Sequence, residues 1–310
     1  MINPAVTYDG ARLVVAITGS SGLIGSALVH ALEARGHAVK RMVRRAAAGP
    51  NEIAWHPGAS AVDARVASQL EGVDVVVNLA GENLAQRWTD RARRSIVESR
   101  VPGTLLLSRT IAQLTRKPRL MISGSAVGIY GNRGDELLDE SSTLGDDFLA
   151  RVCKDWEAAT QAASEAGIRV ALSRTGLVLD RHGGAFPQFL LQFRLGAGGR
   201  LGNGRQWMSW ITLRDVIGVF NFLIDHEEIS GPVNVVAPEP VTNAEFVRVL
   251  GRVLKRPTVF TVPEFGLKLV FGQMAEDTVL ASQRARSLRL AEYGFKDAGL
   301  EAALRDVISR

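Results

Sequence analysis

Residues 12–45 read RLVVAITGSSGLIGSALVHALEARGHAVKRMVRR, and this stretch decides the fold. An apolar run of strand length, Arg12 to Ile17, leads directly into a glycine turn. Residues 26–35 then carry Ala, Leu and Val at helical spacing, Gly36 ends that helix, and residues 37–43 are expected to form a second strand. The succession of strand, tight turn, helix and strand predicts a β-α-β unit with parallel strands and a right-handed crossover.

The same alternation continues toward the middle of the chain. Pro102 interrupts one long helical pattern, so we expect a kink or a break near Arg100. Strands that alternate with helices are typical of an α/β fold, here a Rossmann doubly wound parallel sheet. The further strands are expected at 52–55, 73–79, 119–123 and 169–173, and the helices at 63–70, 89–114 and 147–166.

The pattern changes after Gly176. Residues 183–204 are rich in glycine and include one apolar helix. Alternation then resumes with a helix at 213–225 and a strand at 233–236 that could rejoin the sheet. An N-cap pattern at 242–245 opens a helical C-terminal region. We therefore expect a smaller α-rich C-terminal cap beside the sheet. The predicted division is a nucleotide-binding Rossmann domain of residues 11–178 plus 207–237 and a substrate or cap domain of residues 179–206 plus 238–310.

The composition favours a globular protein and argues against a nucleic-acid partner. The 310 residues are 46% apolar and 22% charged, enough for a full hydrophobic core. The formal net charge of +5 raises the question of an anionic polymer. However, the only dense basic cluster lies at residues 87–94, and Asp90 dilutes it. We interpret this cluster as a solvated helix face and expect no nucleic acid to bind.

Cysteine and histidine usage excludes several kinds of site. Cys153 is the only cysteine, so no intramolecular disulfide and no cysteine-based zinc site can form. The five histidines are scattered without metal-ligand spacing, so no metal is expected. The beginning of the sequence lacks an apolar signal core, and no later stretch reaches the ~18 continuous apolar residues of a membrane span. We expect a soluble, cytoplasmic protein that binds no membrane.

The glycine turn has the features of a dinucleotide site. A backbone that passes close to a pyrophosphate needs residues without side chains, and a helix N-terminus supplies free N–H groups. Three glycines at the junction of an apolar strand and a helix provide both. The expected cofactor contacts in this turn are Gly19, Ser20, Ser21, Gly22, Leu23, Ile24 and Gly25.

The end of the second strand indicates which dinucleotide binds. NAD enzymes place a carboxylate there, about 20 residues after the glycines, to bind the ribose 2′-hydroxyl. Here Arg44 and Arg45 occupy that place, and we expect no carboxylate nearby that would repel a 2′-phosphate. An arginine fork can hold a 2′-phosphate, so we expect NADP(H) rather than NAD(H). The alternative is that the two arginines only cover the edge of the sheet.

Several separate motifs resemble the extended short-chain dehydrogenase/reductase superfamily: the turn from Thr18 to Gly25, Asn78-Leu-Ala-Gly-Glu-Asn83 and Ile129-Tyr-Gly131. More narrowly, Arg205-Gln-Trp-Met-Ser-Trp-Ile211 and Thr242-Asn-Ala-Glu-Phe246 are similar to its atypical, epimerase-like family 39U, the nucleoside-diphosphate-sugar epimerase-like proteins. The resemblance implies NADP(H) binding with a cap that closes over the nicotinamide. It also implies further cofactor contacts at Leu79, Ala80, Gly81, Arg100, Lys154, Leu177 and Val178.

The superfamily's catalytic pair is missing from this sequence. The resemblance implies a tyrosine four residues before a lysine, because residues at i and i+4 share one face of a helix. None of the three tyrosines, Tyr8, Tyr130 and Tyr293, is followed by a lysine at that spacing. On the expected helix Lys154 is present, but Ala150 stands where the tyrosine would be. We therefore expect weak activity or another source of the proton.

The remaining catalytic candidates are Ser125, Tyr130 and Lys154. Ser125 lies one residue from the place of the superfamily's catalytic hydroxyl, and Glu82 is a further possible proton donor. Two functions stay open. One is an NADP(H)-dependent oxidoreductase or epimerase-like enzyme that acts on a small carbonyl or hydroxyl substrate. The other is a non-catalytic NADPH-binding regulatory or sensor protein. A homodimer is possible, because superfamily relatives often pair through the helices expected here at 89–114 and 147–166.

Overall fold

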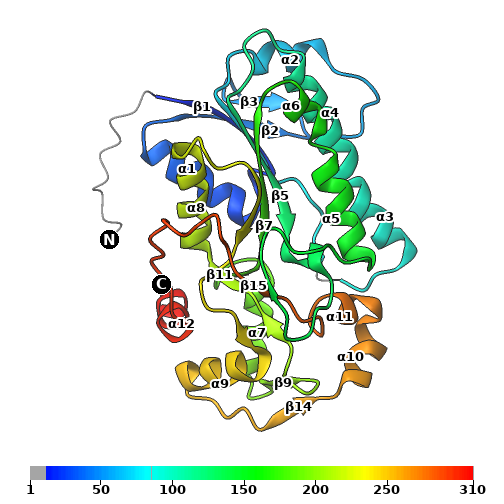
Figure 1. Ribbon diagram of the computed structural model, residues 1–310, viewed down its shortest axis with the longest axis vertical. Coiled ribbons are helices and arrows are strands. Elements are labelled where there is room, and N and C mark those ends of the chain that lie inside the picture. Colours follow the sequence, from blue (N-terminus) through cyan, green and yellow to red (C-terminus); the bar gives the residue numbers. More distant parts are fainter. Residues whose placement is uncertain (1–11, 85, 310) are drawn as a thin grey trace.

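A parallel sheet of seven strands forms the centre of the protein (Figure 1). The computed structural model describes residues 12–84 and 86–309. The strand order is β12-β7-β5-β4-β1-β2-β3. Strands β2 and β3 lie on one side of β1, and the chain then continues with β4 on the other side; doubly wound folds bind their ligands at this switch point. The predicted α/β Rossmann fold is thereby confirmed. The strands are β1 (Val14–Thr18), β2 (Ala38–Val43), β3 (Glu52–Ala54), β4 (Val75–Asn78), β5 (Leu120–Ala126), β7 (Arg169–Thr175) and β12 (Gly231–Val235).

Helices cover both faces of this sheet. One face packs against α1 (Leu23–Ala34) and α8 (Leu213–Asp225). The opposite face packs against α2 (Ala64–Leu70), α4 (Val101–Ala112) and α6 (Gln161–Glu165). All residues of β4 are buried because helices lie on both sides of it, which explains why its sequence is a continuous apolar run.

The long helix predicted at 89–114 breaks where we expected. Its first part, α3 (Asp90–Glu98), begins after Thr89, whose side chain accepts a hydrogen bond from the backbone of the first turn. The second part, α4, begins directly after Arg100 with Pro102 in its first turn. Proline is tolerated there because the first N–H groups of a helix have no partner within it.

The helix predicted at 147–166 is also divided, which its sequence pattern did not indicate. It consists of α5 (Phe148–Ala158) and the short α6. At the junction the hydroxyl of Thr160 donates to the carbonyl of Glu157 at 2.7 Å. A side-chain bond of this kind competes with the helical backbone bonds and marks the break.

The chain leaves the sheet after β7 and returns to it later. The predicted strand at 233–236 does rejoin the sheet, because β12 pairs in parallel with β7 at one edge. Before that return, β8 (Leu177–Leu179) pairs in parallel with β11 (Trp210–Thr212). Segments far apart in the sequence therefore lie side by side where the sheet meets the cap.

The remaining elements form a smaller cap at one end of the sheet (Figure 1). Its core joins α7 (Phe186–Arg194), α9 (Asn243–Leu254) and α12 (Leu300–Ser309). In the described part of the chain, no helix has the length and apolar character that a bilayer crossing requires. The short elements are η1 (Val127–Tyr130), β6 (Leu137–Leu138), β9 (Gly199–Leu201), β10 (Trp207–Met208), β13 (Val241–Thr242), β14 (Phe260–Val262), α10 (Glu264–Phe271), α11 (Gln273–Asp277) and β15 (Arg284–Ala285).

A buried carboxylate fixes the C-terminal segment to α8. Asp215 is fully buried and accepts hydrogen bonds from the Oη of Tyr293 at 3.1 Å and from the backbone N–H groups of Lys296 and Asp297, each at 2.9 Å. Burial and the neighbouring Asp215 raise the pKa of Tyr293, so its phenol stays protonated and remains a donor. Asp215 therefore has a structural role, and these hydrogen bonds satisfy its buried side-chain oxygens.

Candidate functional site

The glycine turn is packed so closely that side chains are excluded from it. Gly19 has a φ of +65°, and a Cβ there would lie 2.6 Å from the carbonyl carbon of Leu79. A Cβ on Gly25 would lie 2.2 Å from the carbonyl oxygen of Gly19. The turn therefore presses against the end of β4 and against the first turn of α1, as the close passage of a backbone under a ligand requires.

The N-terminus of α1 opens beside this turn. Gly22 precedes the helix, and no side chain caps its first N–H groups. Ser21 and Gly22 are exposed, Leu23 and Ile24 are half-buried, and Ser20 is buried beneath them. Uncapped N–H groups and the positive end of the helix dipole form a site for an anion. Among the predicted turn residues, Ser21 and Gly22 lie open to such an anion.

A buried polar network holds the loop after β4 beside the turn. Thr18 donates to Asn78 at 2.7 Å and accepts from the backbone N–H groups of the two residues that follow Asn78, at 3.1 and 3.3 Å. Asn78 in turn donates to Thr104 at 2.7 Å, and the indole of Trp156 donates to the same hydroxyl at 2.9 Å. These bonds fix the predicted cofactor-binding loop, Leu79 to Gly81, against the glycine turn.

Arg100 supports the same loop from below. Its buried guanidinium donates to the carbonyls of Glu82 at 2.9 Å and Ile96 at 3.1 Å and lies over the ring of Trp156. A Cβ on Gly81 would lie 3.0 Å from the Arg100 Cζ. Burial disfavours the charged form of Arg100 and lowers its pKa. Glu82 itself lies exposed on this loop.

The two arginines after β2 lie in different surroundings. Arg45 forms a two-point ion pair with Glu52, with N–O distances of 2.7 and 2.6 Å. The expectation that no carboxylate stands near this pair was therefore wrong: β3 runs beside β2 and brings Glu52 to Arg45. The hydrogen bonds from Arg45 lower the pKa of Glu52 to about 2. Arg44 is exposed and has no ion-pair partner in the described chain, so its guanidinium is available to an anion, whereas that of Arg45 is shared with Glu52.

A second buried network joins two predicted catalytic residues. Ser125, at the end of β5, donates to the carboxylate of Glu157 at 2.6 Å. Glu157 accepts two further hydrogen bonds from Arg174, each at 2.9 Å, and Arg174 donates to the Oη of Tyr130 at 3.0 Å. Burial lowers the pKa of Arg174, but the hydrogen bonds and charge of Glu157 outweigh it, so the net shift is upward. Ser125 and Tyr130 are thus linked through the Glu157–Arg174 ion pair and not by a hydrogen bond to each other.

Tyr130 is fully buried, and both roles of its hydroxyl are filled. It donates to the Oδ1 of Asn234 at 2.7 Å and accepts from Arg174. Burial raises its pKa, although the charge of Arg174 opposes the shift. This placement gives Tyr130 a packing role between η1 and β12 and leaves no free proton to offer a substrate.

Lys154 is the one predicted catalytic residue whose polar group is uncommitted. It is half-buried on α5, and its amine has no hydrogen bond or ion pair with any described residue. Four residues earlier, Ala150 is fully buried, so the tyrosine of the superfamily has no space at this position. Leu177 and Val178 are half-buried on β8, beside β11. Within the described residues, no group of His, Cys, Asp or Glu could hold a metal ion.

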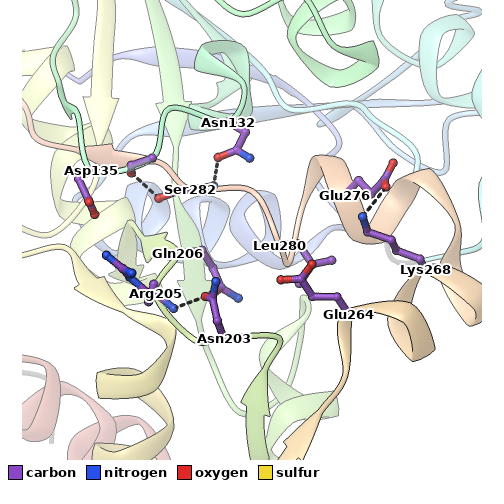
Figure 2. A pocket seen from close by; sticks show the side chains of 11 residues that line it. Asn132, Asp135, Asn203, Arg205, Gln206, Glu264, Lys268, Glu276, Leu280 and Ser282 are labelled. Atoms are coloured by element: carbon purple, nitrogen blue, oxygen red, sulfur yellow. Dashed lines mark hydrogen bonds and ion pairs between the residues drawn. The ribbon is translucent and has the colours of Figure 1, made fainter.

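A polar cavity of about 500 Å³ lies among the loop after η1, the loop after β9 and the helices α10 and α11 (Figure 2). One side comes from the loop after η1, with Asn132 and Asp135. The opposite side comes from the glycine-rich loop after β9, with Asn203 and Arg205, and from the start of α10. The volume lies within the range of about 300–1,000 Å³ that holds small ligands.

Comparison with known proteins agrees with this geometry. The sequence profile of the NAD dependent epimerase/dehydratase family matches residues 15–236. A domain of unknown function, DUF1731, matches residues 262–307. The chain belongs to the NAD dependent epimerase/dehydratase family.

Relatives of this epimerase family member span nearly its whole length. It is 45% identical over 287 residues to the epimerase family protein Mb2239 of Mycobacterium bovis, which covers 92% of this chain and 94% of that protein. It is 34% identical to human epimerase family protein SDR39U1, over 95% of this chain and 99% of the human protein. The crystal structure of human SDR39U1 isoform 2 with NADPH matches with a TM-score of 0.86 at 33% identity, over 96% of this chain and 100% of that chain. The resemblance to family 39U is confirmed.

Sequence reasoning missed three residues of this family member's site: Glu157, Arg174 and Asn234. Arg174 lies within the strand sequence RVALSRT. Burying a charged side chain on such a strand costs free energy unless an opposite charge pairs with it. That cost is the feature that could have identified it. Glu157 and Asn234 come from other elements, and only the packing of α5 and β12 around β7 reveals them as partners.

Proposed function

We propose that this protein binds NADP(H) and acts as an oxidoreductase or epimerase-like enzyme on a small carbonyl or hydroxyl compound. The observation that carries the proposal is the closed glycine turn at the N-terminus of α1, with the unpaired Arg44 at the end of the neighbouring β2. The similarity to human SDR39U1, which was crystallised with NADPH, supports the choice of cofactor. The single buried cysteine is consistent with a cytoplasmic location.

The residues present fit this cofactor along its length. The N–H groups of the glycine turn would hold the pyrophosphate, and Arg44 would hold the 2′-phosphate. The loop from Leu79 to Gly81 would pass beneath the cofactor, supported by Thr18 and Asn78. Lys154 would bind the nicotinamide ribose with its free amine. Bound NADP(H) would supply the hydride, and the protein would position and shield it.

The proton has no dedicated donor in this arrangement. Ser125 already donates its proton to Glu157, so its oxygen is left to accept a hydrogen bond and to orient a substrate hydroxyl. Tyr130 is buried, and its hydroxyl already donates to Asn234 and accepts from Arg174. A positioned general acid typically contributes ~10²–10⁴ in rate, so we propose slow turnover with a proton taken from solvent.

Cofactor binding and turnover test the proposal separately. Titration of the protein with NADPH and NADH, followed by nicotinamide fluorescence, should show a preference for NADPH. A screen of small carbonyl and hydroxyl compounds should then show substrate-dependent absorbance change, reduced in Lys154→Ala. Failure to bind either cofactor would refute the proposal. Tight NADPH binding without any turnover would favour the non-catalytic sensor instead.

A further inference from the structure

The polar cavity beside α10 presents polar groups whose orientation the backbone fixes (Figure 2). The Oδ1 of Asn132 accepts from the N–H of Ser282 at 3.1 Å, which leaves its Nδ2 free to donate. The Oδ1 of Asn203 accepts from the N–H of Arg205 at 2.8 Å, which leaves its Nδ2 free as well. Gln206 shows the reverse arrangement: its Nε2 donates to two backbone carbonyls at 3.0 Å each, and its Oε1 has no partner among the described residues.

The cavity thus offers two oriented hydrogen-bond donors, the amide nitrogens of Asn132 and Asn203, and one oriented acceptor, the amide oxygen of Gln206. A hydroxyl group both donates and accepts, so a ligand with several hydroxyls can satisfy such an array at successive positions. Gln206 and Ser282 are buried at 8% and 5% exposure and form the floor, whereas Asn132 and Asn203 are exposed at the rim. A site built on oriented polar groups discriminates strongly against ligands that cannot pair with them.

The charges around the cavity oppose a diphosphate. Lys268 is held by Glu276 at 2.9 Å, so its charge is neutralised within the wall (Figure 2). Asp135 and Glu264 add two carboxylates that have no cationic partner in the described chain, and only Arg205 offers an unpaired cation. A ligand with two negative charges would meet a wall with excess negative charge.

We propose that this cavity is the substrate site and that its substrate is a small, uncharged polyhydroxylated compound, a polyol or its carbonyl form, that carries no phosphate. This inference rests on the proposed function, since the bound compound would be the one that the enzyme converts. The choice of a polyol follows from the oriented amides and the excess carboxylates.

Saturation-transfer NMR on the protein tests this choice directly, with and without saturating NADPH. The probes are sorbitol, mannitol, galactitol and myo-inositol on one side, and uridine diphosphate and inorganic pyrophosphate on the other. We expect saturation of at least one polyol and no competition from either phosphate compound. The proposal is overturned if no polyol receives saturation, or if uridine diphosphate binds the wild-type cavity more tightly than every polyol.

Charge-neutral variants locate the binding in this cavity. Asn203→Ala should weaken the polyol signal about two- to tenfold, the effect of losing one hydrogen bond. The double variant Asp135→Asn with Glu264→Gln should raise uridine diphosphate binding roughly tenfold, because it removes the repelling carboxylates. Glu292→Gln, an exposed carboxylate that does not line the cavity, is the matched control and should change neither. Equal effects of all variants would refute the assignment. Absence of NADPH binding would refute the proposed function while leaving the polyol result valid.

Discussion

The carboxylate of Glu157 and the guanidinium of Arg174 face each other through two hydrogen bonds of 2.9 Å, with side chains only 10% and 5% exposed. This pair joins α5 to β7 and holds the hydroxyl of Ser125 on one side and that of Tyr130 on the other. The two predicted catalytic hydroxyls, of Ser125 and Tyr130, are thus both held by one buried ion pair.

Breaking this pair on one side should destabilise the protein strongly. Arg174→Met leaves the Glu157 carboxylate buried without a counter-charge, which typically costs ~3–5 kcal/mol. Urea unfolding followed by tryptophan fluorescence measures the loss. The double variant Arg174→Met with Glu157→Gln should recover a large part of it. Single-variant losses below ~1 kcal/mol would contradict this account of the pair.

The glycines of the turn should tolerate alanine unequally. Gly19→Ala and Gly25→Ala place a Cβ 2.6 and 2.2 Å from backbone atoms, so both should abolish NADPH binding and lower the melting temperature. Gly22→Ala, whose Cβ would lie 3.3 Å from the nearest atom, should fold but bind NADPH less well. Gly49→Ala adds a Cβ in open space and is the control. Calorimetry and cofactor fluorescence distinguish these outcomes.

Arg44 and Arg45 should contribute unequally to NADPH affinity. Arg44→Ala removes the unpaired guanidinium and should cost ~1.5–3 kcal/mol of binding, the worth of hydrogen bonds to a charged group. Arg45→Ala should cost less, because Glu52 already holds Arg45. Glu52→Gln should release Arg45 and increase NADPH affinity. Titration with NADPH measures these losses. If Arg45→Ala lowers NADPH affinity as much as Arg44→Ala does, the ion pair with Glu52 does not prevent Arg45 from binding the cofactor.

Cys153 should be unreactive in the folded protein. Burial raises the pKa of its thiol to about 12, so almost no thiolate is present at neutral pH. Labelling by a chromogenic disulfide reagent should be slow in buffer and fast in urea. Because the folded pKa lies above the ordinary value of 9.0, this group's stabilising contribution is complete below pH 9 and is lost as the pH rises toward 12. Cys153→Ala should remove that part of the alkaline loss of stability; an unchanged alkaline profile would contradict it.

Gly218 should be replaceable only when Tyr293 is shortened. A Cβ on Gly218 would lie 1.9 Å from the Oη of Tyr293, so Gly218→Ala must displace the Tyr293 side chain. Adding Tyr293→Phe removes the clashing oxygen and should restore part of the lost melting temperature. Tyr293→Phe alone loses the bond to Asp215 and should cost about 1 kcal/mol. No rescue in the double variant would show that the contact does not limit this position.

The sequence by itself determined the order of elements and the glycine turn. The turn was predictable because its glycines stand at a strand-to-helix junction, and the close contact of Gly25 with the Gly19 carbonyl lies within the same turn. The break before Arg100 was predictable for the same reason, since Pro102 acts on its own helix. The second helix break was not predictable, because Thr160 ends the helix through a side-chain bond that many threonines do not make.

Only the tertiary structure decided which polar side chains are free and which are committed. Arg44 and Arg45 are adjacent in sequence, but the pairing of β2 with β3 gives Arg45 to Glu52 and leaves Arg44 open. Tyr130 was a catalytic candidate by its motif, and the return of β12 to the sheet buried it against Asn234. A local pattern records the conformation of its own backbone, whereas the partner of a charge or hydroxyl comes from distant segments that meet only when the chain folds.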